Sequence, residues 1–152
     1  MNLSDLLGPA HVFADLRAAD KSLLLHALAS RAATLLGTPP AEITAALAAR
    51  EALGSTGVGR GMAVPHAYLV RLPATAAFLA RLERPVDYAA IDEQPVDLVF
   101  LLLGPPAARS EHLAALAAAT RRLRNPATAK ALRMAKEAQE MRDRFLAEPA
   151  ET

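Results

Sequence analysis

Cysteine is absent from this chain of 152 residues, and so is tryptophan. Without cysteine the protein has no disulfide, no thiolate metal ligand and no cysteine nucleophile, a composition that fits a reducing cytoplasm. Phenylalanine, tyrosine and tryptophan together make up only 4% of the residues. We therefore expect an aliphatic core, built from leucine, valine, isoleucine and the many alanines.

An excess of charge of one sign is also lacking. The chain has 17 lysines and arginines against 16 aspartates and glutamates, a formal net charge of +1. A protein dedicated to nucleic acid usually carries a clear positive excess, so no nucleic-acid partner is expected. One local imbalance exists, because residues 109–144 hold nine lysines and arginines but only four aspartates and glutamates. This positive excess has two possible explanations: a docking face for an acidic partner, or the solvated face of two helices.

Long apolar runs are missing as well. The N-terminus lacks the basic region followed by an apolar stretch that marks a secretory signal. The longest strand-like apolar run, residues 96–103, includes Asp97 and is far too short to cross a bilayer. We therefore expect a soluble, cytoplasmic protein with no membrane insertion.

The glycine-rich stretch at residues 54–61 matches no nucleotide-binding motif. It is not a Walker loop, because no Gly-Lys-Ser/Thr follows, and its glycine spacing is not that of the dinucleotide fingerprint. The four histidines lack the paired spacing of a zinc site. A Gly-x-Ser-x-Gly nucleophile elbow is also missing. No cofactor and no metal are therefore expected.

The residues that are present suit one domain spanning residues 1–152. The chain is 53% hydrophobic and 22% charged, which is enough to build a core. Periodicity and breakers predict helices over about 20–36, 40–53 and 110–124, then a short helix that ends at about Met134 and a last one that ends at about Leu146. Asp20 and Ser110 are expected as N-caps and Gly37 as a stop. Strands are predicted at 12–13, 62–64, 75–82 and 96–103.

The last of these strands decides the fold class. Its run Val96 to Leu103 is apolar on both faces, as in a central strand covered by helices on each side. Strict alternation of strand and helix is absent, which argues against an all-parallel sheet. We predict an α/β protein, a three-layer α/β/α sandwich with a small mixed β-sheet.

His66 is the candidate reactive residue. It follows the glycine-rich loop and a short strand, and Pro65 stiffens the chain before it. Imidazole is a nucleophile near neutral pH. The amides of Gly57, Val58 and Gly59 can form a concavity that favours an anion such as phosphate. From spacing alone, a turn histidine after a structural loop is the alternative.

His112 is a second candidate, in the first turn of the helix that Ser110 is predicted to cap. Free amides at such a position favour an anion and disfavour a protonated imidazole. A neutral imidazole there can donate a hydrogen bond to a phosphoryl oxygen. The alternative is an exposed first-turn histidine, which is the more common case.

A longer pattern surrounds His66. The stretch Glu-Ala-Leu-Gly-Ser-Thr-Gly-Val-Gly-Arg-Gly-Met-Ala-Val-Pro-His-Ala, residues 51–67, resembles the active-site signature of the fructose/mannitol-type enzyme IIA family. This family belongs to the bacterial phosphoenolpyruvate-dependent phosphotransferase system. Residues 91–98 are similar to the segment that enters its central strand, and residues 111–116 to its second-histidine helix. The sequence departs from the family at Ala67, where glycine is common, and at Arg60, where a residue such as asparagine is common.

The resemblance implies roles for individual residues. His66 corresponds to the histidine that carries the phosphoryl group on Nε2, and Arg50 and His112 correspond to the other catalytic residues. Arginine suits such a site because it can give two parallel hydrogen bonds to a phosphoryl group. The hydroxyls of Ser55 and Thr56, with the backbone of Gly57, Val58 and Gly59, make up the expected phosphoryl-binding set.

The resemblance also implies a function. We expect a phosphotransferase with a phosphohistidine intermediate, which takes its phosphoryl group from a histidine-containing phosphocarrier protein. A free-standing chain of this kind is similar to the nitrogen-regulatory branch, which acts on regulated target proteins. One alternative is a sugar-specific enzyme IIA that passes phosphate to a fructose/mannitol-class permease domain. Another is a non-catalytic binding module on the same fold.

Overall fold

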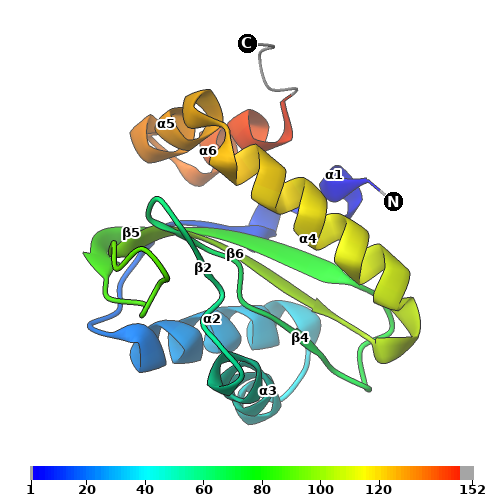
Figure 1. Cartoon of the computed structure of the whole chain (residues 1–152). Coiled ribbons are helices and arrows are strands. Elements are labelled where there is room, and N and C mark those ends of the chain that lie inside the picture. The colour runs from blue at the N-terminus through cyan, green and yellow to red at the C-terminus, as the bar shows by residue number, and fades with distance from the viewer. Residues whose placement is uncertain (1, 148–152) are drawn as a thin grey trace.

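A mixed β-sheet separates two layers of helices (Figure 1). The structure, a computed structural model, describes residues 2–147. One face of the sheet packs against α2 (Lys21–Leu36) and α3 (Pro40–Ala52). The other face packs against α1 (Leu3–Leu6), α4 (Arg109–Arg124), α5 (Pro126–Met134) and α6 (Ala138–Leu146). The predicted three-layer α/β/α sandwich is confirmed.

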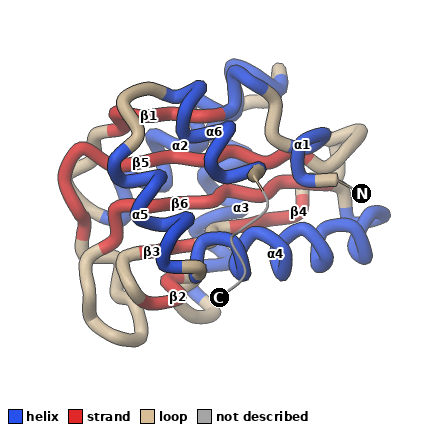
Figure 2. Tube along the Cα trace, turned by 90° about the horizontal axis from the view of Figure 1, so that it is seen from above, coloured by secondary structure: helices blue, strands red, loops and turns tan. Residues whose placement is uncertain are grey.

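The sheet has six strands in the order β1-β5-β6-β3-β2, with β4 beside β6 beyond the end of β3 (Figure 2). The strands are β1 (Val12–Leu16), β2 (Gly57–Gly59), β3 (Met62–Ala63), β4 (His66–Tyr68), β5 (Ala76–Val86) and β6 (Val96–Gly104). Strands β5 and β6 are antiparallel, whereas β1 runs parallel to β5 and both β3 and β4 run parallel to β6. The sheet is therefore mixed, as predicted.

Strand β6 is the centre of the molecule. Its side chains alternate between the two cores: Val99, Leu101 and Leu103 face α2 and α3, while Phe100 and Leu102 face the other helical layer. All are fully buried. This alternation follows from the two-residue period of a strand, and it confirms the prediction of an interior strand with helices on both faces.

Two helix boundaries follow directly from the sequence. The Asp20 carboxylate accepts a hydrogen bond from the amide of Leu23 at 2.8 Å, which caps the N-terminus of α2. Gly37 ends the same helix in the left-handed conformation, with φ of 68°.

The prediction that Ser110 caps α4 is wrong, because a 3₁₀ turn at Pro106–Ala108 leads straight into a helix that begins at Arg109. Ser110 therefore lies inside the first turn.

The predicted loop at residues 54–61 is wrong in its second half. Gly57–Gly59 form β2, which pairs antiparallel with β3 across a tight turn at Arg60 and Gly61. The pairing partner satisfies the backbone of this glycine-rich segment, although its residues have little strand propensity. His66 is not in a turn but opens β4, which pairs with β6. Within residues 2–147, no helix is long and apolar enough to cross a membrane.

Candidate functional site

A depression of about 450 Å³ lies where β4 runs between the two helical layers. Helix α3 contributes Arg50, β4 contributes His66 and Tyr68, and α4 contributes His112 and Leu113. Helices α3 and α4 cover opposite faces of the sheet (Figure 1), so the depression sits at the edge that β4 forms. The structure thus brings together the three residues that the sequence predicts as catalytic.

The ring of His66 is held at both nitrogens. Its Nδ1 lies 2.9 Å from the carbonyl oxygen of Val64. Because a carbonyl only accepts hydrogen bonds, Nδ1 carries the proton and Nε2 carries the lone pair. The Nε–H of Arg50 donates to this lone pair, at 3.3 Å. His66 is therefore neutral in this arrangement, with its nucleophilic nitrogen turned toward the arginine.

Arg50 is positioned by its own helix end. It lies in the last turn of α3, and its Nη1 donates to the carbonyl of Gly54 at 2.9 Å. The guanidinium is thus fixed at two points, on the loop behind it and on the ring of His66. A fixed guanidinium loses little side-chain freedom when it binds an anion.

His112 is buried, with 1% of its surface exposed, and is not the exposed first-turn histidine of the alternative reading. Its ring centroid lies 5.7 Å from that of His66 and 4.4 Å from that of Tyr68. Neither ring nitrogen has a hydrogen-bond partner among the described residues. Burial, and then the nearby His66 and Arg109, lower the pKa of His112 to about 4. The imidazole is therefore neutral at pH 7 and has one N–H to donate.

The five residues of the predicted phosphoryl-binding set lie behind the depression and do not line it. The amide of Thr56 donates to the Glu51 carboxylate at 3.0 Å, and the Thr56 hydroxyl bonds both Glu51 and the Tyr88 hydroxyl. Ser55 Oγ donates to the carbonyl of Tyr88 at 3.2 Å and accepts the amide of Gly57. Val58 and Gly59 belong to β2. Direct contact between these residues and a phosphoryl group stays a prediction.

Glu51 is the centre of this network. Lys21 Nζ lies 2.9 Å from its carboxylate, and the ammonium also sits 4.4 Å from the centroid of the Tyr88 ring. Burial acts to raise the pKa of the Glu51 carboxyl, but hydrogen bonds from Thr56 and Lys21 together hold it below its ordinary value. Burial raises the pKa of the Tyr88 hydroxyl, which therefore stays protonated. These interactions of Glu51, Lys21, Thr56 and Tyr88 thus hold in place the loop whose Gly54 carbonyl accepts the hydrogen bond from Arg50.

Sequence reasoning missed Tyr68. Its ring packs on His112, and the guanidinium carbon of Arg109 lies 5.4 Å from its centroid. The signal that could have found it is its spacing, since residues two apart on a strand point to the same side. Tyr68 follows His66 at this spacing on β4.

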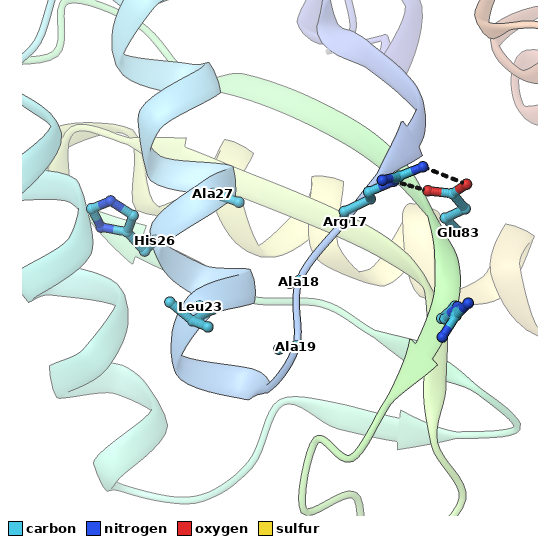
Figure 3. Close-up of a pocket in the computed structure, with 8 residues that line it drawn as sticks. Arg17, Ala18, Ala19, Leu23, His26, Ala27 and Glu83 are labelled. Carbon is cyan, nitrogen blue, oxygen red and sulfur yellow. Dashed lines mark hydrogen bonds and ion pairs between the residues drawn. The ribbon is translucent and has the colours of Figure 1, made fainter.

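A larger hollow, of about 630 Å³, lies beside the start of α2 (Figure 3). It contains Arg17, Leu23, His26 and Glu83. Arg17 is paired with Glu83, and His26 is exposed with no hydrogen bond among the described residues. In Figure 3, His26 lies across the hollow from the ion pair. No three potential metal ligands of the histidine, cysteine or carboxylate kind cluster anywhere in residues 2–147.

Known proteins share this arrangement of elements. The family described as phosphoenolpyruvate-dependent sugar phosphotransferase system, EIIA 2, matches residues 5–148. The chain belongs to this family. A nitrogen regulatory protein of Bradyrhizobium diazoefficiens is 43% identical over 139 residues, which cover 91% of each protein.

Two solved structures resemble this one. The nitrogen regulatory protein IIA-Ntr of Neisseria meningitidis superposes with a TM-score of 0.88 at 29% identity, over 93% of this chain and 97% of that one. The mannitol IIA of Escherichia coli shares the fold, with a TM-score of 0.75 at 21% identity over 91% and 97%. The predicted family is confirmed. These relations support a phosphocarrier role in the phosphotransferase system and in nitrogen regulation.

Proposed function

We propose that this protein accepts a phosphoryl group on Nε2 of His66 from a histidine-containing phosphocarrier protein, and that its phosphorylation state serves nitrogen-related regulation. The observation that carries this proposal is the ring of His66. Val64 holds the proton on Nδ1, and Nε2 keeps its lone pair beside a fixed arginine. A neutral imidazole in this tautomer is ready to attack without losing a proton first.

The transfer step needs little from the protein except alignment and positive charge. The Nε2 lone pair of His66 forms a bond to phosphorus while the phosphorus–nitrogen bond to the carrier's histidine breaks, and the carrier's nitrogen keeps that electron pair. The proton stays on Nδ1, which continues to donate it to the carbonyl of Val64. The Nε–H of Arg50, which now donates to Nε2, becomes free to donate to a phosphoryl oxygen once Nε2 is bonded.

His112 supplies the second donor in this proposal. A buried N–H without a partner costs about 1–3 kcal/mol, and a phosphoryl oxygen in the depression can supply the partner. The neutral form of the ring is the one that avoids the cost of burying a charge and the repulsion from Arg109. Tyr68 covers the other side of the ring, so its orientation is set before the phosphoryl group arrives.

The segment from Ser55 to Gly59 helps to orient Arg50 by holding the neighbouring loop in place. Its bonds to Glu51 and Tyr88 hold the chain beside Gly54, whose carbonyl orients Arg50.

A protein partner suits the rim of the depression. Leu53 and Leu113, both of which line it, are 85% and 57% exposed. Exposed apolar side chains around a reactive group mark protein–protein contacts, because docking removes them from water. We assign the output to nitrogen-related regulation and not to sugar import, because a nitrogen regulatory protein is 43% identical over 91% of this chain, whereas the mannitol IIA is 21% identical.

The experiment is phosphorylation with purified components. With phosphoenolpyruvate, the first enzyme of the phosphotransferase system and the phosphocarrier protein, the chain should gain one phosphoryl group that is labile to acid and stable to alkali. His66→Ala should abolish the gain, and His26→Ala, a matched change of an exposed histidine, should not. Labelling that survives His66→Ala refutes the assignment. No labelling of the native protein favours a binding module instead.

A further inference from the structure

The far end of α4 carries a second surface feature. A hollow of about 310 Å³ lies between the C-terminal end of α4, helix α5 and the β2–β3 turn. We call it the basic hollow, and its lining includes Arg60, Met62, Arg124, Ala129, Lys130 and Met134. It is separate from the depression at His66, because Arg124 lies roughly 18 Å along the helix from His112 at 1.5 Å per residue.

The walls of the basic hollow carry uncompensated positive charge. No hydrogen bond or ion pair within residues 2–147 involves the side chains of Arg60, Arg124 or Lys130. A fourth cation, Arg133, is bound through several contacts to the carboxylate of Asp97. The lining of the hollow thus has four cations and no acidic side chain, and Asp97 outside it pairs with one of the four. The carboxylate of Asp92 accepts hydrogen bonds from the backbone amides of Arg60, at 2.8 Å, and Gln94.

The floor of the hollow is apolar. Met62 and Ala129 are buried beneath it, while Met134 is 69% exposed at its edge. An exposed methionine in a ring of cations offers an adaptable contact for one apolar side chain. A hollow of this size takes a side chain or two, whereas nucleic acid needs a longer run of phosphate contacts.

Arg60, which lines the hollow, has an unfavourable backbone conformation. It has φ of 58°, followed by Gly61 with φ of 81°, in a two-residue turn between β2 and β3. Such turns favour asparagine or glycine at the first position, because other side chains are strained in the left-handed region. An outlier of this kind points to a role for the side chain.

The turn is built into the surface. Arg133 Nη2 donates to the carbonyl of Arg60 at 2.9 Å, and a Cβ at Gly61 would lie 2.7 Å from that same nitrogen. Figure 1 shows the turn rising from the sheet to the layer that contains α5. The guanidinium of Arg60 is therefore presented by a fixed hairpin and not by a loose loop.

We propose that the basic hollow is a docking site for an acidic protein segment that carries an apolar side chain. Acidic residues pair with Arg60, Arg124 and Lys130, and the apolar side chain covers the floor beside Met134. The proposal does not rest on phosphorylation of His66, because no residue of the basic hollow lines the depression there.

The test uses the full chain and a fluorescein-labelled peptide in which two leucines are flanked by aspartates and glutamates. Its control peptide has asparagine and glutamine at the acidic positions. Fluorescence anisotropy should show binding that weakens with added salt, and chemical shifts of the protein amides should change around the β2–β3 turn and α5. Each of Arg60→Asn, Lys130→Gln and Met134→Ser should weaken binding by about threefold or more. Arg121→Gln, a matched change on α4 outside the basic hollow, should not.

Arg60→Asn separates binding from stability. Asparagine tolerates the left-handed turn better, so this variant should melt about 2–4 °C higher than the native protein while it binds the peptide less well. Its phosphorylation by the carrier should be unchanged. The proposal is overturned if the acidic peptide fails to bind at millimolar concentration, if the neutral peptide binds equally, or if Arg60→Asn binds like the native chain. A single-stranded oligonucleotide that binds more tightly at the same residues also overturns it.

Discussion

The depression at His66 and the hollow at Arg17 contain the same residue types and differ in how those residues are held. Each has a histidine, an arginine and an exposed leucine. At the depression, both ring nitrogens of the histidine and two nitrogens of the arginine have defined partners. At the larger hollow, Arg17 is neutralised by Glu83 and His26 has no partner among residues 2–147. Volume and composition therefore do not identify the reactive site, but fixed orientation does.

The largest expected difference is between substitutions of the two arginines, Arg50 and Arg17. Arg50→Ala removes a charged donor beside the nucleophile and should slow transfer by roughly 10²–10³-fold, the usual effect of losing one such donor. Arg17→Ala removes an arginine from the larger hollow and should leave the rate unchanged. Rapid-quench measurement of phosphoprotein formation checks both. Equal slowing by the two changes would show that net charge, and not orientation, controls the transfer.

His112 and His26 should differ in how much they contribute to the pH dependence of the unfolding free energy. The native pKa of His112 is lowered to about 4 by burial and by the adjacent His66 and Arg109, whereas an unfolded histidine titrates near 6.5. As pH falls from 7 to 5, the unfolded chain takes up a proton that the native ring does not. The native state should therefore lose about 2 kcal/mol of stability from this group.

Urea denaturation across this pH range checks the prediction about His112. His112→Gln should flatten the fall in unfolding free energy by about the same 2 kcal/mol, and His26→Gln should keep the native slope. If His112→Gln leaves the slope unchanged, the ring is not held neutral in the native protein.

The smallest expected difference concerns the two carboxylates that pair with cations. Glu51 bonds Lys21 and Thr56 in a mostly buried setting, so Glu51→Gln should lower the free energy of unfolding by about 1–2 kcal/mol. Glu83 pairs with Arg17 at the exposed surface, and Glu83→Gln should make no measurable change. The denaturation midpoint at neutral pH checks both. A larger effect at Glu83 would mean that the exposed pair, and not the Glu51 network, stabilises the fold.

Much of the fold was predictable because single segments determine it. The doubly apolar run at Val96 to Leu103, the Asp20 cap and the Gly37 stop each act through local chemistry, and each was predicted correctly. Strand β2 was missed because its glycines become a strand only through pairing with β3. The start of α4 was misplaced because the preceding 3₁₀ turn, and not the hydroxyl of Ser110, sets it.

The site was predictable in part. The resemblance of the stretch around His66 predicted Arg50 and His112 as the other residues of the site, and the structure places all three at one depression. Tyr68 and Tyr88 were missed because their importance lies in packing and hydrogen bonds across the fold, to His112 and to Thr56. Distances of this kind depend on tertiary structure, and the only local signal was the two-residue spacing of Tyr68 from His66.

The most direct measurement locates the phosphoryl group on the ring. After phosphorylation by the carrier with ¹⁵N-labelled protein, the histidine side-chain nitrogens can be correlated with ring protons and with phosphorus by NMR. We expect a single phosphorus–nitrogen bond at Nε2 of His66, with the proton still on Nδ1 and its hydrogen bond to Val64 intact. A phosphoryl group on Nδ1 of His66, or on His112, would contradict it.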